Sequence, residues 1–383
     1  MIVLSRLGGL SRHRVPGDDG AIVLFGFPGL GDLVRCHSLV RLIAAQFPQR
    51  PIDLVARRPA VEIAAFMPEI REAIGEDFRH NCLTLTERWA LAQRLRARGY
   101  RTAYLVQSSF KAALVPFLAG IPERIGWSEE GRLALLTRPR FHMRRLPRMV
   151  DRTCWLGLHC NEEAPPRWPE PRLRVPVSLT AQFDVLVRKA RAMAPVVAIA
   201  PGSAHTYKNW PVENYAALAQ HCVQAGCTVW IVGSSGHDAL AEAIAKAAPV
   251  HDHLVDSVTK LALSIAAADI FVGNDSGPLH IAGAFSKPSI GIFGHHEIAS
   301  KAPINASVKK VVPELRHVQT SVRDVHWPSL DRVIHRFDRV LDSTRAADRL
   351  SSASMLLNAV PPGATEPRSA STADPANGLR APY

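Results

Sequence analysis

Long apolar runs and a leader-like start are both missing from this sequence. No apolar stretch approaches the roughly 20 residues of a membrane-spanning helix, so we expect no such segment. The first 20 residues carry basic residues and glycines without the continuous apolar core of a signal peptide. We therefore expect a flexible extension over residues 1–20 and a cytoplasmic protein.

Cysteine is scarce, and no two cysteines have Cys-x-x-Cys spacing. The six cysteines among 383 residues indicate neither a disulfide framework nor a zinc ribbon. We expect free thiols, as in a reducing compartment, and no metal site.

Acidic charge is in deficit. Forty-six Lys and Arg stand against 34 Asp and Glu, and the formal net charge of +12 favours nucleic acid, an anionic membrane surface or a phosphorylated substrate as a partner. No array of aromatic residues is interleaved with the arginines, so we do not expect nucleic-acid binding. Part of the charge lies in the proline-broken stretch 138–148. This stretch is either a solvated loop or a patch for acidic lipid or a phosphorylated acceptor.

What the sequence does contain is a regular alternation of short apolar runs and helical periodicities. Strands are predicted at 21–27, 52–56, 102–107, 120–127, 196–200, 228–232, 270–273 and 289–293. Helices are predicted at 33–47, 61–66, 87–98, 110–118, 180–192, 212–225, 239–247, 261–267 and from 281. Strands and helices that alternate at this length predict parallel, doubly wound α/β sheets.

Prolines crowd between residues 165 and 176 and mark a linker between two similar halves. We therefore predict two Rossmann-like domains, at 21–175 and 176–345, that face each other across a cleft. Beyond residue 345 the composition turns to Ser, Ala, Pro, Thr and Gly, which predicts a disordered tail over 346–383.

The clearest motif is the turn after the strand at 270–273, with the sequence Asn274-Asp-Ser-Gly-Pro-Leu-His280. The first amides of the helix behind it have no partner within the helix, and together with the helix dipole they bind anions. Asp275 and Ser276 suit the cap, Gly277 lets a ligand approach the backbone, and His280 lies about one turn further on. The alternative is an ordinary capped helix with a buried histidine.

A second strand, glycine-rich turn and helix lie at 21–47. Its glycines do not have GxGxxG spacing, so nicotinamide binding is not expected. Asp32, at the start of the helix, is either a cap or a functional carboxylate. In the predicted fold the turns at 29–32, 202–208, 233–238 and 275–280 lie at the carboxyl ends of strands and converge on the cleft. Several such turns with one lysine, Lys208, predict a nucleotide-diphosphate site.

These motifs resemble glycosyltransferase family 9, the heptosyltransferases of lipopolysaccharide core assembly, and most closely its second-heptosyltransferase branch. The resemblance spans about residues 21 to 340. The stretches that carry it are Gly31-Asp32, Pro201-Gly202, Lys208-Asn209-Trp210-Pro211, Asn274 to His280 and, for the branch, 108–117 and 119–124.

The resemblance implies a GT-B fold and a transfer that inverts the anomeric carbon without a metal or cofactor. The donor would be ADP-L-glycero-D-manno-heptose and the acceptor a phosphorylated heptosyl-Kdo–lipid A core. Asp32 corresponds to the catalytic base, and fixed donors would meet the charge that develops on the leaving ADP. Donor binding is predicted for Gly202, Ser203, Lys208, Asp238, Asp275, Ser276, Gly277 and His280, and acceptor binding for Ser109, Lys111 and Arg124.

Two departures from the family pattern leave points open. His237-Asp238 stands where the family often has a carboxylate for the ribose, and either residue is a candidate for that contact. His295-His296-Glu297 replaces the usual turn near the sugar pocket. The alternatives are a family 9 enzyme with another sugar donor or glycan acceptor, and a non-catalytic nucleotide- or glycan-binding paralogue. We expect a monomer that associates peripherally with the anionic inner membrane.

Overall fold

The structure, a computed structural model, describes residues 20–79, 82–158, 164–165, 167–192, 194–294, 298–314 and 325–358. Almost all of the predicted N-terminal extension and the stretch 295–297 lie outside these residues. The chain up to Leu341 forms one compact unit and the residues from Asp342 onward form a second.

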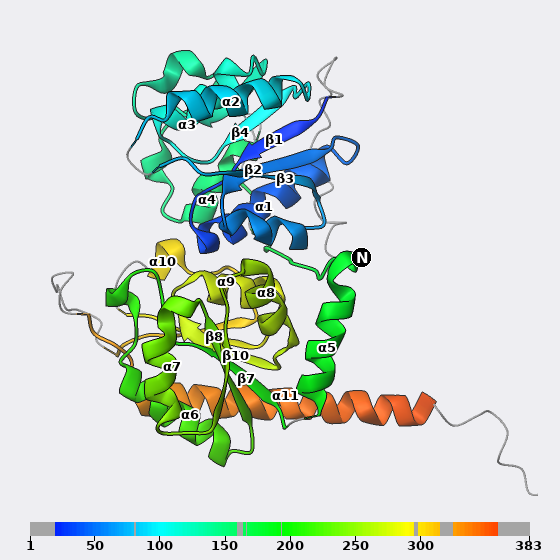
Figure 1. Cartoon of the computed structure of the whole chain (residues 1–383), viewed down its shortest axis with the longest axis vertical. Helices are drawn as coiled ribbons and strands as arrows, with labels where there is room; N and C mark the ends of the chain where they lie inside the picture. Colours follow the sequence, from blue (N-terminus) through cyan, green and yellow to red (C-terminus); the bar gives the residue numbers. More distant parts are fainter. Residues whose placement is uncertain are drawn as a thin grey trace, which may run out of the picture. The chain divides into compact units, whose positions relative to one another are not determined.

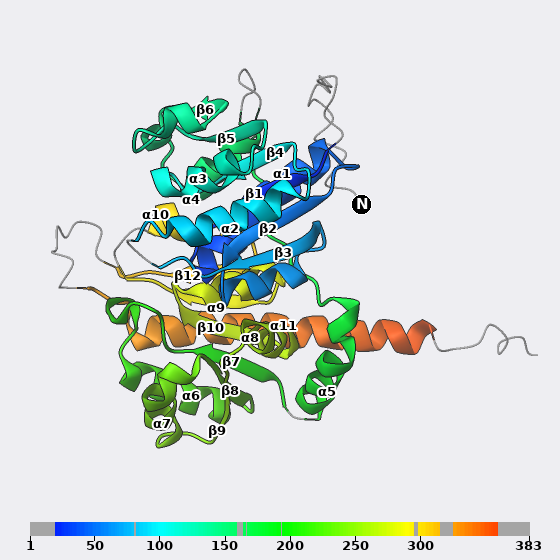
Figure 2. The same cartoon turned by 45° about the horizontal axis from the view of Figure 1, so that its top comes forward.

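The first sheet has six parallel strands in the order β3-β2-β1-β4-β5-β6 (Figure 1 and, with all six labelled, Figure 2). Its strands are β1 (Ile22–Phe25), β2 (Ile52–Arg57), β3 (Ile70–Glu76), β4 (Thr102–Leu105), β5 (Glu123–Trp127) and β6 (Arg138–Arg140). The inner strands are buried on both sides, because helices cover both faces of a parallel sheet. The strand order reverses between β1 and β4, and ligands of such sheets bind at that reversal.

The second sheet repeats the arrangement, with parallel strands in the order β12-β11-β10-β7-β8-β9. Its strands are β7 (Val196–Ala200), β8 (Thr228–Gly233), β9 (Val250–Leu254), β10 (Ile270–Asn274), β11 (Ser289–Ile292) and β12 (Val308–Val311). Here the order reverses between β7 and β10. Two parallel, doubly wound sheets confirm the predicted fold class.

Helices connect the strands. The α-helices are α1 (Leu30–Gln46), α2 (Leu85–Arg96), α3 (Phe110–Leu118), α4 (Met149–Cys154), α5 (Thr180–Arg191), α6 (Val212–Gln224), α7 (Asp238–Ala245), α8 (Val258–Ala267), α9 (Gly277–Ala284), α10 (Ile298–Lys301) and α11 (Leu330–Asn358). Short 3-10 helices include η2 (Ala60–Phe66), η3 (Arg132–Leu135), η4 (Met143–Arg145), η7 (Thr206–Lys208) and η8 (Ser235–His237).

Three apolar cores hold these layers together. One lies between the first sheet and α2 and α3, and another between the second sheet and α6, α7 and the first part of α11. The third and largest joins the two sheets through α1, α8 and α9. Figure 1 shows α1, α9 and α8 in the layers between the two sheets, and Figure 2 shows α9 and α8 between β3 and β7. The helices α1 and α9, which follow β1 and β10 at the two strand reversals, therefore pack in one continuous core.

The linker is hydrogen-bonded on both sides. The amide of Leu173 donates to the carbonyl of Ala284, and the amide of Arg174 donates to the carbonyl of Phe66. The strands of the two sheets fall on either side of this segment along the chain, and the domain boundary at 175/176 remains a prediction.

The structure also differs from the sequence-based expectations. It adds β3, β6, β9 and β12, and it places Arg138–Arg140 of the expected basic loop in β6. The tail expected to be disordered from residue 346 is helical up to Asn358, because α11 continues that far. Residues 359–383 lie outside the described part of the chain.

Candidate active site

The turn after β10 is built around an ion pair. Nζ of Lys208 lies 2.8 Å from Oδ2 of Asp275, and both side chains are only 13% exposed. Ser276 is the N-cap of α9, but its side chain makes no cap hydrogen bond and its Oγ is buried without a partner. Asp275 thus holds the lysine, and the first amides of α9 are left for another acceptor.

The charges of this turn are set by burial and by each other. Burial by itself raises the pKa of Asp275, but the hydrogen bond and charge of Lys208 outweigh it and hold that pKa below its usual range. Burial, with Arg35 nearby, lowers the pKa of His280 to about 3. At neutral pH the site therefore contains an ionised Asp275 and an uncharged His280.

The start of α1 packs directly on the start of α9. A Cβ atom on Gly31 would lie 2.9 Å from Cδ2 of His280 and 3.4 Å from Cα of Gly277, and one on Gly277 would lie 3.1 Å from Leu30. Glycine at both positions allows the two backbones this approach. The two turns singled out from the sequence, at 29–32 and 275–280, therefore touch.

Asp32 lies in the first turn of α1, a helix whose N-cap, Gly29, provides no side-chain cap. Its carboxylate is 42% exposed, and its Oδ1 lies 2.9 Å from Nη2 of Arg35. Arg35 is buried, and its Nε and Nη1 have no hydrogen-bond partner. Sequence reasoning missed Arg35; its position three residues after Asp32, on the same helix face, was the available signal.

Asn274 explains the polar–aromatic loop at 208–211. It is fully buried, and its Oδ1 accepts from the amide of Trp210 and from the hydroxyl of Tyr215 at 3.0 and 2.8 Å. Its Nδ2 donates to the carbonyl of Pro201 at 2.6 Å. One side chain thereby fixes the turn after β7, the segment that carries Lys208, and α6. Its role had not been recognised from the sequence.

The turns after β7 and β8 meet through His237. A Cβ atom on Gly202 would lie 2.5 Å from the His237 ring, and burial lowers the pKa of this histidine. Ser203 donates through Oγ to the carbonyl of His205. Asp238 is exposed at the start of α7. The structure thus brings His237 rather than Asp238 against the Gly202 turn, and the donor contact predicted for Asp238 remains a prediction.

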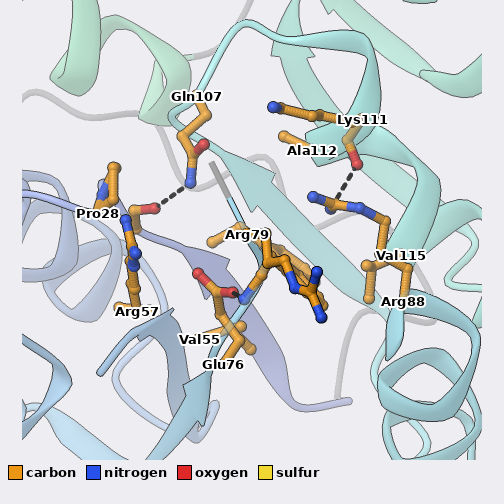
Figure 3. A pocket seen from close by; sticks show the side chains of 14 residues that line it. Pro28, Val55, Arg57, Glu76, Arg79, Arg88, Gln107, Lys111, Ala112 and Val115 are labelled. Carbon is orange, nitrogen blue, oxygen red and sulfur yellow. Dashed lines mark hydrogen bonds between the residues drawn. The ribbon is translucent and has the colours of Figure 1, made fainter. Parts of the chain in front are cut away.

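A pocket opens at the carboxyl edge of the first sheet, beside the turn that leads to Asp32 (Figure 3). It is an open concavity, and its space together with the solvent at its mouth amounts to about 640 Å³. Its lining residues come from the ends of β1 to β4 and from α2 and α3, and include Pro28, Arg57, Glu76, Arg79, Arg88, Gln107 and Lys111. Its lining is basic, with three arginines and a lysine against one carboxylate.

Two of these lining residues stiffen the pocket. Nε2 of Gln107 donates to the carbonyl of Gly26 at 2.7 Å, and Nη1 of Arg88 donates to the carbonyl of Lys111 at 2.8 Å. Arg88 also lies over the Phe78 ring. The bond from Arg88 therefore ties the start of α3, which carries Lys111, to α2.

The other two predicted acceptor residues do not line this pocket. Ser109 is the N-cap of α3, and its Oγ is buried without a partner. Arg124 donates to the carbonyls of Ile121 and Leu135 and lies over the Phe117 ring. Their acceptor roles remain predictions.

The described residues contain no group of three or more His, Cys, Asp and Glu side chains that could hold a metal ion. None of the described helices is long and apolar enough to cross a membrane. None of the five cysteines that the structure describes forms a disulfide, and all but Cys82 are buried.

Comparison with known proteins identifies the class. The fold matches the structure of E. coli ADP-heptose lps heptosyltransferase II with a TM-score of 0.73 and 26% identity, over 85% of this chain and 99% of that one. It also matches E. coli heptosyltransferase WaaC with ADP, at a TM-score of 0.67 and 17% identity over 84% of this chain and 99% of the other. The fold is that of a GT-B glycosyltransferase.

The sequence comparisons are more specific. Residues 88–326 match the model of glycosyltransferase family 9 (heptosyltransferase). The chain is 32% identical to lipopolysaccharide heptosyltransferase 2 of Escherichia coli, over 71% of this chain and 82% of that protein. It is 31% identical to lipooligosaccharide heptosyltransferase 2 of Haemophilus influenzae, over 71% and 83%. The chain belongs to glycosyltransferase family 9.

Proposed function

We propose that this chain is an inverting, metal-independent heptosyltransferase. It moves L-glycero-D-manno-heptose from ADP-heptose to the heptosyl-Kdo–lipid A inner core of lipopolysaccharide. The observation that carries the proposal is the contact between two helix starts, where Gly31, next to Asp32, touches Gly277 and His280 of the anion-binding turn. The similarity to E. coli lipopolysaccharide heptosyltransferase 2 supports the choice of donor and acceptor.

Asp32 acts as the general base. Arg35 holds its Oδ1, so Oδ2 of the partly exposed carboxylate remains for the acceptor hydroxyl. As the hydroxyl oxygen bonds to the anomeric carbon, Asp32 takes its proton, and the bond from that carbon to the ADP oxygen breaks. A single base on the face opposite the leaving group inverts the carbon and needs no covalent intermediate.

The donor-side turns stabilise the departing ADP. Lys208 has three ammonium protons, so it can keep its bond to Asp275 and also bind a phosphate oxygen. The free amides at the start of α9 face the same anion, and the uncharged His280 lies beside them. Gly202 and Ser203 follow β7 at the strand reversal, where the nucleotide would lie. Lysine and helix amides supply the charge compensation that a divalent ion provides in other transferases.

The basic pocket on the first sheet receives the acceptor. Arg57, Arg79 and Lys111 line it, and guanidinium and ammonium groups suit a phosphorylated sugar. Pro28 connects this pocket to the turn that carries Asp32. The enzyme works as a monomer at the cytoplasmic face of the inner membrane, and its positive charge holds it there peripherally.

The decisive measurement is ADP release from ADP-heptose in the presence of mono-heptosylated Kdo–lipid A and EDTA. We expect turnover by the parent and a loss of about a thousandfold in kcat for Asp32→Asn, the size of a general-base contribution. Asp184→Asn, an exposed aspartate on α5, is the matched control and should behave like the parent.

The other outcomes divide the proposal into its parts. Turnover that EDTA abolishes and Mg²⁺ restores would refute metal independence. Full turnover by Asp32→Asn would refute the base. A parent that binds ADP without turning over would move the sugar or the acceptor to another compound, and a parent that does not bind ADP would end the adenine-nucleotide proposal.

A further inference from the structure

Large apolar side chains are exposed mainly on one part of the molecule. Among the described residues eleven such side chains are exposed, and seven of them lie between Leu83 and Phe141. Five lie on three neighbouring elements and form what we call the apolar patch: Leu85 and Trp89 on α2, Phe110 and Phe117 on α3, and Leu133 on η3, each 42 to 55% exposed. A monomer that leaves such side chains together in water generally uses them for binding.

Helical spacing places these side chains in stripes. Leu85 and Trp89 are four residues apart and lie on one side of α2, and Phe110 and Phe117 are seven apart on one side of α3. The opposite sides of both helices are buried in the core with the first sheet, through residues such as Leu91 and Val115. The exposed stripes thus lie on the outer surface of the helical layer.

Hydrogen bonds hold the three elements together. Arg88 donates to the carbonyl of Lys111 at one end of α2, and Arg96 donates to the carbonyl of Leu118 at the other. Nη1 of Arg132, at the start of η3, donates to the carbonyl of Ser109 just before α3. The helices therefore lie alongside each other, and Leu133 is carried next to the start of α3. The patch therefore lies on three elements that are neighbours in space.

The same part of the chain carries most of the net charge. Residues 82–148 contain thirteen Lys and Arg and four Asp and Glu, so this stretch supplies +9 of the total of +12. Ten of the thirteen basic residues are exposed or partly exposed, among them Arg94, Arg96, Arg144 and Arg145. Apolar side chains among cations are the composition that binds an anionic membrane interface, where tryptophan is favoured and arginine reaches the headgroups.

The charge also argues against a second copy of this chain as the occupant. Two copies joined through the patch would bring two strongly positive surfaces together, and like charges across an interface cost binding energy. An anionic lipid surface neutralises the same residues. The chemistry therefore selects lipid over self-association.

The same two helices line one side of the pocket. Arg88, next to Trp89, and Lys111, next to Phe110, line it, and Figure 3 shows Arg88 and Lys111 on its α2 and α3 side. We infer that the apolar patch is the surface by which the protein docks on an anionic bilayer, with the pocket mouth at the lipid headgroups. This inference rests on the proposed function in one respect only: a lipid-linked acceptor is the reason for the protein to bind a membrane.

Vesicle sedimentation with the full chain tests the surface. We expect binding to phosphatidylcholine vesicles that contain about one third phosphatidylglycerol, and much weaker binding to pure phosphatidylcholine. Trp89→Asp/Leu133→Asp should bind the anionic vesicles about a hundredfold more weakly, since each large apolar side chain is worth about tenfold. Val185→Asp, a matched change at an exposed position on α5, should bind like the parent. A double variant that sediments like the parent, or a parent that does not sediment, would overturn the inference.

Fluorescence tests insertion independently of sedimentation. Trp89 is half-exposed, whereas the other six tryptophans are buried or partly buried. Anionic vesicles with brominated acyl chains should quench the parent, and Trp89→Phe should remove the quenching while binding is kept. Binding by the parent without quenching would mean that the patch does not enter the membrane.

Activity separates this inference from the proposed function. The double variant should turn over a soluble, de-acylated acceptor at the parental rate and lose at least about tenfold on acceptor embedded in anionic vesicles. Turnover without vesicle binding by the parent refutes the surface and keeps the function. Vesicle binding through the patch without turnover keeps the surface and refutes the function.

Discussion

At the scale of single residues, the candidate site is a set of charges that are only partly compensated. Lys208 is neutralised by Asp275, whereas Arg35 is buried with a single bond from Nη2 to Asp32 and two free nitrogens. Unpaired buried donors are unfavourable for folding. Such residues are expected where a bound anion or a reacting carboxylate makes use of them.

The Lys208–Asp275 pair gives a prediction that separates stability from chemistry. Lys208→Met should lower the free energy of unfolding by about 3 kcal/mol, because it leaves a buried carboxylate unpaired. Lys208→Met/Asp275→Asn removes both charges and should return to within about 1 kcal/mol of the parent. Both variants should lose about a hundredfold or more in kcat, since the donor phosphates lose their lysine.

Urea unfolding and ADP-release kinetics on the same samples check this. If the double variant regained activity along with stability, Lys208 would be a structural residue only.

At the scale of elements, the site depends on two helices that start against each other. The core that joins the sheets runs through α1, α8 and α9, and the closest backbone approach is between Gly31 and Gly277. Neither helix has a side-chain cap hydrogen bond. Their first amides therefore stay free at the place where the four turns meet.

Gly31→Ala should destabilise the protein by about 2 kcal/mol, although Gly→Ala inside a helix normally stabilises by about 1 kcal/mol. The added methyl group would lie 2.9 Å from the buried His280 ring and push α1 from α9. Gly29→Ala, in the same turn, meets nothing closer than 3.4 Å and should cost less than about 1 kcal/mol. Thermal unfolding of the two variants compares them. Equal melting temperatures would show that α1 and α9 accommodate the added methyl group of Gly31→Ala without loss of stability.

At the scale of the whole molecule, buried histidines couple folding to pH. The folded chain keeps His280 uncharged down to about pH 3, whereas an unfolded histidine takes a proton near 6.5. Below pH 6.5 the unfolded chain thus binds more protons, and stability falls as the pH drops toward 3. Burial also lowers the pKa of His37 and the pKa of His237, so these two histidines also make the folded chain less stable as the pH drops.

The free energy of unfolding falls as the pH drops from 6.5 to 5, where few carboxylates titrate. His280→Gln should make this fall less steep, by about 0.7 kcal/mol per pH unit at pH 6.5 and by about 1.4 kcal/mol per pH unit near pH 5. His251→Gln changes an exposed histidine of β9 and should leave the slope as it is. Denaturant unfolding at a series of pH values measures both. A His280→Gln slope equal to that of the parent would mean that His280 titrates normally in the folded chain.

The inner strands of both sheets could be predicted from the sequence, and the edge strands could not. The eight inner strands were all expected, since a strand covered on both faces is a continuous apolar run, as in Val196–Ala200. The four missed strands, β3, β6, β9 and β12, are the outermost strands of the two sheets. Edge strands carry polar and charged residues, as in Val250–Leu254, so no apolar run marks them.

By itself the sequence determined the local pieces: apolar strands, glycine-rich turns, helix starts and the family that their motifs indicate. Those features depend on neighbours along the chain. Only the tertiary structure decided that Gly31 touches His280, that Lys208 pairs with Asp275, that Arg35 holds Asp32, and that α2 and α3 leave large apolar side chains exposed. Such contacts join residues that are distant in sequence or depend on which helix face is buried, and close packing of the shared core selects them.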